Sequence, residues 1–242
     1  METTKLKFEY AVENGKESGI PVIIVAAGAS ARMQGINKQL LEIKGVPVIV
    51  KTLLAFEKSQ CIKNIILVVK ESDLYELQIL TEKYSITKLT DIVCGGKTRQ
   101  ESVLKGLARI KQTDKNVLIH DGARPFVSEE IISAVAQALN TYDAVTCAVK
   151  PKDTIKQVDE TGKIINTLNR NTLIAVQTPQ GVNIEKYRKA IETVEDFTAY
   201  TDDTSIMEAA GFTAATVNGS YKNIKITTPE DIALAEIYGE EQ

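Results

Sequence analysis

The chain has 242 residues, of which 43% are hydrophobic and 25% are charged, a composition typical of a globular protein and not of a disordered one. Its 29 basic and 32 acidic residues leave a net charge of −3, so no broad positive field attracts nucleic acid or an anionic membrane. Any phosphate group must therefore be bound at a local site, and no apolar run approaches the ~20 residues that a membrane-spanning helix needs.

The amino-terminal segment and the cysteines indicate where the protein works. Residues 1–20 are charged and lack the apolar centre of a secretory signal, so we interpret them as an extension before a single domain over residues 21–242. Cys61, Cys94 and Cys147 lie far apart and form no CxxC pair, which favours reduced thiols over disulfides or a zinc site. These features predict a cytoplasmic protein that binds neither nucleic acid nor a membrane.

From residue 21 onward, short β-branched runs alternate with amphipathic stretches. The runs are continuously apolar, which is typical of strands that are buried on both faces of a parallel sheet. The expected strands are Val22–Ala26, Ile65–Val69, Ile92–Cys94, Val117–Ile119 and Ala144–Val149, with helices near 47–58, 72–84, 98–111 and 128–140. This alternation predicts an α/β protein with an open, mostly parallel, doubly wound sheet of the Rossmann-like type.

Ligands of such sheets bind beyond the carboxyl ends of the strands. Unusual residues fall at three of these ends: Gly28 after the first strand, 95–98 after the third and 120–125 after the fourth. We therefore expect the ligand site to lie where these three loops meet.

Between about residues 150 and 176 the pattern changes. Thr154–Val158 and Ile164–Leu168 alternate polar and apolar residues on either side of a turn at Asp159–Gly162, which predicts a β-hairpin arm projecting from the sheet. A two-stranded hairpin is marginal alone, so we expect the arm to pack on the second subunit of a homodimer. The remaining expected elements are helices near 183–195 and 202–210, a strand at 213–217 and a last helix that opens at Thr228-Pro229.

Two familiar nucleotide motifs do not fit the chain. A GxGxxG dinucleotide fingerprint after the first strand would need glycines where Ser30 and Met33 stand, and an acidic residue about twenty positions further on. The Gly96-Lys97-Thr98 segment resembles the end of a P-loop, but Asp91 occupies the position of the leading glycine.

The loop from Val25 to Gln39 is the remaining candidate for a phosphate site. Its small residues at 26–31 let backbone N–H groups approach a triphosphate, while Arg32 offers a planar fork and Lys38 a compact charge. A surface turn with solvated basic side chains would have the same composition, so the loop alone leaves both interpretations open.

Five segments, taken together, resemble a known family. They are Ala26-Ala27-Gly28 with Arg32-Met33 and Lys38, then Gly95–Ser102, His120–Pro125, Gln177–Gln180 and Asn223–Thr227. The first resembles the signature of nucleotidyltransferases that act on sugar nucleotides. The whole set, which covers roughly residues 20–240, is similar to the 2-C-methyl-D-erythritol 4-phosphate cytidylyltransferase family of non-mevalonate isoprenoid biosynthesis. The resemblance implies an enzyme that joins CTP to a small polyol phosphate and releases pyrophosphate.

The resemblance also implies roles for individual residues. Arg32, Lys38 and Lys225 would be catalytic, the first two on the leaving phosphates and Lys225 on the α-phosphate. Asp121 would bind CTP and hold Mg²⁺, for which one carboxylate is enough. The other implied CTP-binding residues are Ala26, Ala27, Gly28, Gly96 and Ser102. The implied acceptor-binding residues are Arg124, Thr154, Arg170, Thr178 and Thr201, with the first three reached from the arm of the second subunit.

Two alternative functions stay open at this stage. A ribitol-5-phosphate cytidylyltransferase would share the chemistry, although Gly122-Ala123 and Asn169-Arg170-Asn171 favour methylerythritol phosphate. A non-catalytic nucleotide-binding module would not need Arg32, Lys38, Asp121 and Lys225 together. Lys97 stands where the family commonly has an acidic residue, so the chain departs from the family pattern beside the base edge. For His120 we expect a hydrogen-bonded structural role, and we interpret Asp202 and Asp203 as first-turn residues of a helix.

Overall fold

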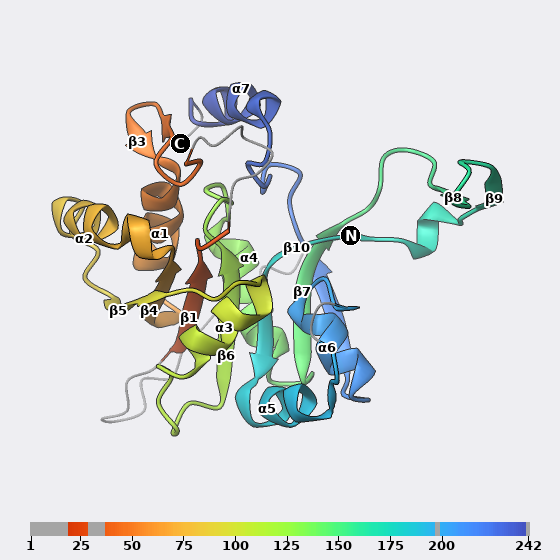
Figure 1. The fold of residues 1–242 in the computed structure, drawn as a ribbon, viewed down its shortest axis with the longest axis horizontal. Coiled ribbons are helices and arrows are strands. Elements are labelled where there is room, and N and C mark those ends of the chain that lie inside the picture. The colour runs from red at the N-terminus through yellow and green to blue at the C-terminus, as the bar shows by residue number, and fades with distance from the viewer. Residues whose placement is uncertain (1–18, 29–36, 197–198, 241–242) are drawn as a thin grey trace, which may run out of the picture.

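The computed structural model describes residues 19–28, 37–196 and 199–240, so the expected extension lies almost entirely outside the described residues. Seven strands form one sheet in the order β11-β7-β10-β6-β1-β4-β5 (Figure 1). Their bounds are β1 Ile20–Val25, β4 Ile62–Val69, β5 Leu89–Cys94, β6 Asn116–Asp121, β7 Ala144–Val149, β10 Ala175–Asn183 and β11 Ala214–Asn218. Every strand runs parallel to its neighbours except β10, which is antiparallel to both β6 and β7. The predicted α/β fold with a mostly parallel sheet is confirmed.

Helices cover both faces of the sheet. They are α1 Val48–Lys58, α2 Leu74–Lys83, α3 Arg99–Leu107, α4 Glu129–Ala138, α5 Ile184–Thr193 and α6 Asp203–Ala209, whereas α7 Pro229–Tyr238 packs in a separate apolar cluster. Val22 and Ile24 of β1 belong to a core cluster with side chains of α1, α2 and α4. The intervening Ile23 belongs to a second cluster with side chains of α3, α5 and α6. Because alternate residues of one strand feed two cores, β1 must be apolar throughout, as its sequence indicated.

Two local features differ from the expectations. Strand β10 was not predicted, because Pro179 cannot donate to a ladder and the surrounding residues are polar. The strand accommodates this residue at an irregularity in its pairing with β7, between Val176 and Gln180. The spacing of Thr98 and Glu101 at the start of α3 is typical of a capping box. The Thr98 hydroxyl accepts the Glu101 N–H at 3.0 Å, but the Glu101 carboxylate accepts the Lys97 N–H, so the box is not completed.

A small unpredicted hairpin, β2 (Glu42–Ile43) and β3 (Val46–Pro47), follows the phosphate-loop candidate. Ile43 packs in a third apolar cluster with Ile226 and with Ala235 of α7. This cluster ties the carboxy-terminal helix to the first loop of the chain. It therefore brings the Asn223–Thr227 segment beside the carboxyl ends of the central strands.

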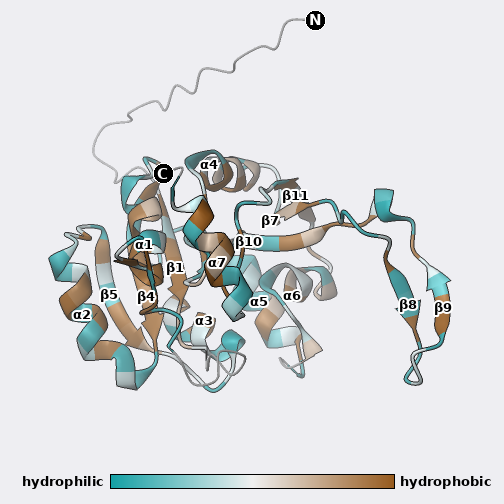
Figure 2. Cartoon of the chain, turned by 90° about the horizontal axis from the view of Figure 1, so that it is seen from above, coloured by the Kyte–Doolittle hydropathy of each residue, from teal (hydrophilic) through white to brown (hydrophobic). Residues whose placement is uncertain are grey.

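The predicted arm is present and extends away from the layered body (Figure 2). Its strands β8 (Lys156–Val158) and β9 (Ile164–Thr167) pair only with each other, and a short 3-10 helix η3 (Arg170–Thr172) follows them. The arm begins after β7 and ends at β10, where Ala175 pairs with Val149. Both ends of the arm are thus anchored at one place on the sheet.

Candidate functional site

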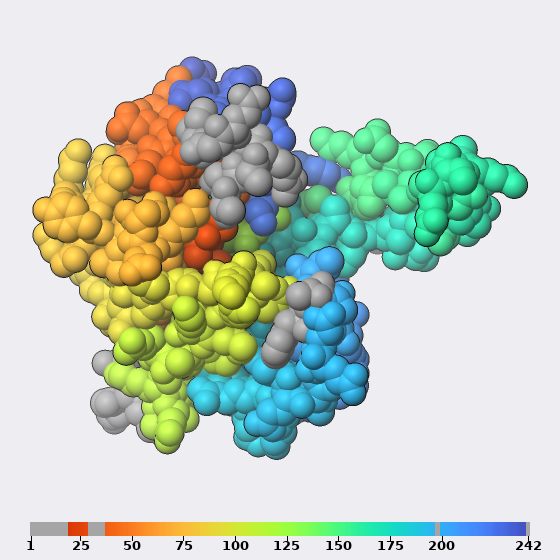
Figure 3. Space-filling model, in the orientation of Figure 1, coloured from red at the N-terminus to blue at the C-terminus, as the bar shows by residue number. Residues whose placement is uncertain are grey.

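A cavity of about 390 Å³ lies at the carboxyl ends of β1, β5 and β6, where the three loops were expected to meet. Figure 3 shows the red start, the yellow-green middle and the blue end of the chain coming together around this hollow. Its lining includes the predicted residues Ala27, Gly28, Lys38, Gly96, Ser102, Asp121 and Lys225, and the unpredicted residues Gln39, Lys70 and Arg99. Arg32 lies outside the described residues.

Asp121 is the centre of charge in the cavity. It ends β6, is 8% exposed, and its Oδ2 lies 2.8 Å from Lys225 Nζ. Arg124 Nε lies 3.5 Å from the same oxygen, and Arg99 Nε lies 3.6 Å from Oδ1. Burial would raise the pKa of the Asp121 carboxyl, but Lys225, Arg99 and Arg124 outweigh it and hold that pKa well below its usual range. The carboxylate is therefore ionised and surrounded by three cations.

The backbone of β1 and the side chains of β10 hold Asp121 in place. Gly122 N–H donates to the Val25 carbonyl at 2.9 Å, and Asp121 N–H donates to the Thr178 hydroxyl at 3.1 Å. Thr178 is 5% exposed and also lies 3.1 Å from His120 Nδ1. Thr178, predicted to bind the acceptor, thus lies behind Asp121 and is absent from the lining of the described cavity.

His120 is completely buried beneath this site. Its second ring nitrogen, Nε2, lies 3.2 Å from the Arg124 carbonyl, and its ring centroid lies 4.8 Å from that of Phe56. Burial lowers the pKa of His120 to about 3, so the ring is neutral at physiological pH. With partners on both nitrogens and no exposed surface, His120 supports the loop that carries Asp121 and Arg124.

The Gly95–Ser102 segment forms the wall opposite Lys225. A side chain at Gly95 would place its Cβ 2.3 Å from the Ala27 Cβ, so only glycine lets the two loops approach this closely. The Ser102 hydroxyl accepts the Gly96 N–H at 3.0 Å and donates to the Thr98 carbonyl at 2.9 Å. The loop that holds Gly96 is consequently rigid and presents backbone groups to the cavity.

The structure separates the residues that were grouped as acceptor-binding arm residues. Placing Arg124 in the arm was wrong, because it follows β6 by three positions and its Nη1 donates to the Asn223 carbonyl at 2.8 Å. Thr154 and Arg170 do lie in the arm, and Arg170 Nη1 donates to the Lys152 carbonyl at 3.1 Å. Neither of them lines the cavity of their own chain.

Sequence reasoning missed Arg99 and the role of Asp203. Asp203 lies in the first turn of α6, as expected, and Asp202 immediately before it is the N-cap, which accepts the Ser205 N–H at 2.9 Å. Asp203 is also fully buried, and its Oδ2 accepts from Arg99 Nη2 at 2.7 Å. The two residues are 104 positions apart, so no local pattern reveals the pair.

The donor set at Asp121 fits a magnesium ion held mainly by a nucleotide. Over residues 19–28, 37–196 and 199–240, no three His, Cys, Asp or Glu side chains cluster as a metal cage would require. Asp121 is the one carboxylate among the residues that line the cavity. Mg²⁺ keeps much of its water and is bound in nucleotide sites by one or two carboxylates together with phosphate oxygens.

Comparison with known proteins points to one family. A sequence model described as 2-C-methyl-D-erythritol 4-phosphate cytidylyltransferase matches residues 20–241. The chain is 44% identical over 220 residues to the enzyme of that name from Clostridium novyi (strain NT), covering 88% of this chain and 94% of that protein. It is 46% identical over 218 residues to the one from Halalkalibacterium halodurans, covering 89% and 94% respectively.

A solved structure gives the same result for the fold. The crystal structure of 4-diphosphocytidyl-2C-methyl-D-erythritol synthase from Anaerococcus prevotii DSM 20548 superposes with a TM-score of 0.82 at 34% sequence identity. The match covers 93% of this chain and 97% of that chain. Separately, no helix in the part of the chain that the structure describes is long and apolar enough to cross a bilayer.

Proposed function

The chain belongs to the 2-C-methyl-D-erythritol 4-phosphate cytidylyltransferase family, and we propose that its cavity joins CTP to that polyol phosphate with release of pyrophosphate. The protein is a nucleotidyltransferase of isoprenoid precursor biosynthesis. The observation that carries the proposal is the Asp121–Lys225 pair at 2.8 Å, set between the Gly28 and Gly96 loops. A non-catalytic binding module would have no reason to gather three cations around one buried carboxylate.

The reaction needs charge neutralisation more than proton transfer. An ionised oxygen of the acceptor phosphate attacks the α-phosphorus of CTP, a new P–O bond forms, and the bond to the leaving pyrophosphate breaks. Lys225 stabilises the charge that builds on the α-phosphate, since a cation at this position acts most strongly in the transition state. Lys38, in the lining, and Arg32 neutralise the leaving pyrophosphate.

Asp121 would hold Mg²⁺ against the phosphates. When bound, the ion supplies positive charge shared between the phosphate oxygens. Lys225 pairs with Asp121 in the structure, so it must exchange this contact for the α-phosphate when the nucleotide enters. Arg99 and Arg124 remain near the carboxylate throughout and keep it ionised.

The Gly96 loop supplies the base selectivity. The Ser102 hydroxyl donates its single proton to the Thr98 carbonyl and accepts the Gly96 N–H, which leaves one lone pair. That lone pair accepts a hydrogen bond from an amino group and cannot donate to a keto oxygen. Cytosine carries an amino group where uracil carries a keto oxygen, so this arrangement favours CTP. Backbone groups of Ala26, Ala27 and Gly28 complete the nucleotide side.

The acceptor side requires a second copy of the chain. Thr154 and Arg170 lie in the arm, away from their own cavity, and serve the cavity of the partner in a homodimer. Among the described residues, five large apolar side chains that are more than 40% exposed belong to the arm and its return to β10: Val158, Ile164, Ile165, Ile174 and Val176. Such a patch on a marginal hairpin fits an interface. Arg124, Thr178 and Thr201 belong to the subunit that carries the cavity.

Three free cysteines suit the reducing cytoplasm, where we place the reaction. The proposal is tested by incubating the purified protein with CTP, Mg²⁺ and either 2-C-methyl-D-erythritol 4-phosphate or ribitol 5-phosphate, and measuring pyrophosphate. We expect faster turnover with the methylerythritol phosphate. Faster turnover with ribitol phosphate would contradict the acceptor, and a fully active monomer in light scattering would contradict the dimer.

A further inference from the structure

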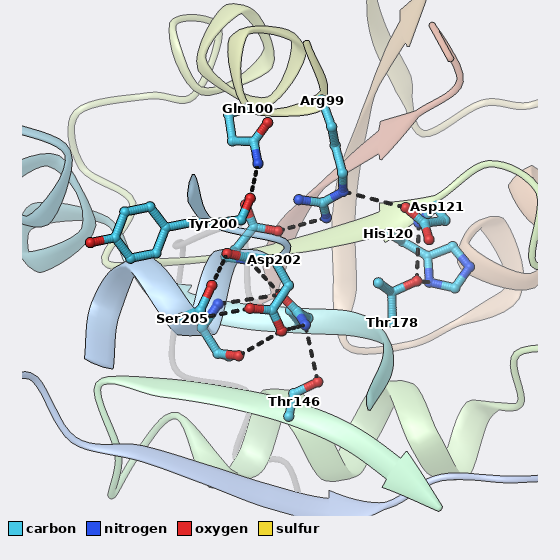
Figure 4. Close-up of polar contacts among 12 residues, drawn as sticks. Arg99, Gln100, His120, Asp121, Thr146, Thr178, Tyr200, Asp202 and Ser205 are labelled. Carbon is cyan, nitrogen blue, oxygen red and sulfur yellow. Dashed lines mark hydrogen bonds and ion pairs between the residues drawn. The ribbon is translucent and has the colours of Figure 1, made fainter. Parts of the chain in front are cut away.

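Two consecutive residues at the start of α3, Arg99 and Gln100, contact the two ends of the turn at Tyr200–Asp203, which leads into α6. Arg99 Nη2 donates to Asp203 Oδ2 at 2.7 Å, and Gln100 Nε2 donates to the Tyr200 carbonyl at 2.5 Å. The two contacts lie on either side of Thr201 in the chain, and Figure 4 shows Gln100 directed at Tyr200 and Arg99 directed at Asp121. A segment held at both ends has little freedom, so α3 fixes where Thr201 lies.

Arg99 also connects this turn to the phosphate site. Its guanidinium lies between two buried carboxylates, with Nη2 2.7 Å from Asp203 and Nε 3.6 Å from Asp121. The planar fork of arginine spans two acceptors in this way, whereas the single ammonium of lysine does not. One side chain therefore sets the distance between Asp121 and the turn.

The other side of the turn is held by the sheet. Gln180 of β10 is 1% exposed, and its Oε1 accepts the Asp203 N–H at 2.9 Å while its Nε2 donates to Asp202 Oδ2 at 2.8 Å. The second Asp203 oxygen accepts from the Tyr187 hydroxyl at 2.8 Å. The network thus runs from Asp121 through Arg99 to the turn and on to the strand that also supports Asp121 through Thr178.

The free energy of folding alone does not explain why a buried polar network holds this turn. Asp203 is completely buried, and replacing a buried ion pair by apolar side chains is often neutral or stabilising. What the network provides instead is a fixed geometry between Asp121 and the turn, because Arg99 contacts both Asp121 and Asp203. In-line transfer depends on such geometry, because reacting atoms must sit within about 3–3.5 Å and a 1 Å displacement lowers the rate about 100-fold.

We infer that Arg99 and Gln100 are positioning residues that hold the Thr201 turn at a fixed distance from Asp121, and so set how the acceptor phosphate is presented to the nucleotide. The inference rests on the proposed function, because it assigns the turn to the acceptor side of that reaction. Neither residue needs to contact the acceptor. Both act through the turn that they hold.

The sharpest test is Gln100→Met, which keeps the length of the side chain and removes the donor to Tyr200. We expect the KM for 2-C-methyl-D-erythritol 4-phosphate to rise at least about 10-fold, because the turn loses one of its two side-chain contacts with α3. The Kd of CTP, measured by calorimetry without acceptor, should change less than about 2-fold, and the thermal midpoint should move by less than about 4 °C. Gln137→Met, on the exposed face of α4, is the matched control and should change none of these values.

Arg99→Lys is the second variant, since it keeps the charge and loses the fork. We expect a larger rise in the acceptor KM, together with a fall in kcat, while CTP still binds. An unchanged acceptor KM in Gln100→Met would overturn the inference, as would equal losses of CTP binding, acceptor binding and thermal stability, which indicate a structural role alone. Absence of pyrophosphate release in the wild-type protein would instead refute the proposed function, so the two failures are distinguishable.

Discussion

The cavity contains a buried cluster of charged side chains, whereas the arm exposes apolar side chains. Asp121 is 8% exposed, ends a central strand and is surrounded by charged and polar side chains of its own chain. Ile164 and Ile165 of the arm are 57% and 60% exposed and belong to a hairpin that pairs with nothing else in the described chain. One chain by itself brings the charged groups around Asp121 together, whereas under the proposed function the acceptor side requires a second copy.

This contrast can be measured. Changes in the cavity should act within each chain and should not depend on protein concentration. Changes in the arm should act on the neighbouring subunit and should depend on whether the dimer forms.

Lys225→Ala should have the largest effect and tests the cavity side of the comparison. We expect turnover to fall at least ~100-fold, about 2.7 kcal/mol, because the cation acts on charge that develops in the transition state. Pyrophosphate release at saturating CTP and acceptor measures it. Lys189→Ala, on an exposed helix surface, is the control and should behave as the wild type. Activity within a factor of three of the wild type would remove Lys225 from the mechanism.

Arg170→Ala should have the next largest effect, a fall in kcat/KM for the acceptor of about 30-fold, as expected for a lost charged contact to phosphate. Mixing this variant with Lys225→Ala then tests whether the arm serves the cavity of the partner subunit. If arms serve the partner, half of the dimers are mixed and each has one intact site, so about a quarter of wild-type activity returns. An equal mixture that stays as inactive as its components would show that the arm serves its own chain or none.

A smaller effect, on stability and not on turnover, is expected for His120, which is buried beneath the cavity. The pKa of His120 is about 3 in the folded chain and near 6.5 in the unfolded one, so the unfolded state takes up the proton first as the pH falls. Stability is therefore fully present above pH 6.5 and declines toward pH 3, by about 1 kcal/mol between pH 7 and pH 5.5. His120 is the only histidine, so His120→Gln should remove this contribution. Urea unfolding of both proteins at the two pH values measures it, and identical pH dependence would refute a buried neutral ring.

The smallest effect is expected for Ser102→Ala, at the base wall. Loss of the hydrogen bond to the cytosine amino group, together with the two that fix the Gly96 loop, should reduce the preference for CTP over UTP by about 3- to 10-fold in kcat/KM. Ser133→Ala, in α4, leaves the cavity untouched and serves as its control. A CTP preference that survives intact would assign base selectivity to backbone groups alone.

Much of the central sheet could be predicted, because buried parallel strands are recognisable as short apolar runs. Since the carboxyl ends of such strands meet at one edge, the convergence of Gly28, Gly96 and Asp121 followed from their positions after the strands. Lys225 did not follow in this way. It lies in an irregular segment before α7, and only the family resemblance linked it to Asp121.

Other parts of the site have no local signature. Arg99 and Asp203 look like ordinary first-turn residues of two helices, and their contact depends on how α3 and α6 pack on the same face of the sheet. Strand β10 was hidden because polar residues and Pro179 are atypical of a central strand. Arg124 was assigned to the arm by analogy, and its true place beside Asp121 depends on the tight turn after β6.

Both ends of the arm join the sheet at one place, which allows the arm to vary in evolution without disturbing the sheet. Val149 and Ala175 are neighbours in paired strands, so the 25 residues between them form a detour whose ends already touch. The entropy of closing such a detour depends only weakly on its length. Arms of different length or sequence can therefore be exchanged at this junction while the seven-stranded sheet and its cavity are kept.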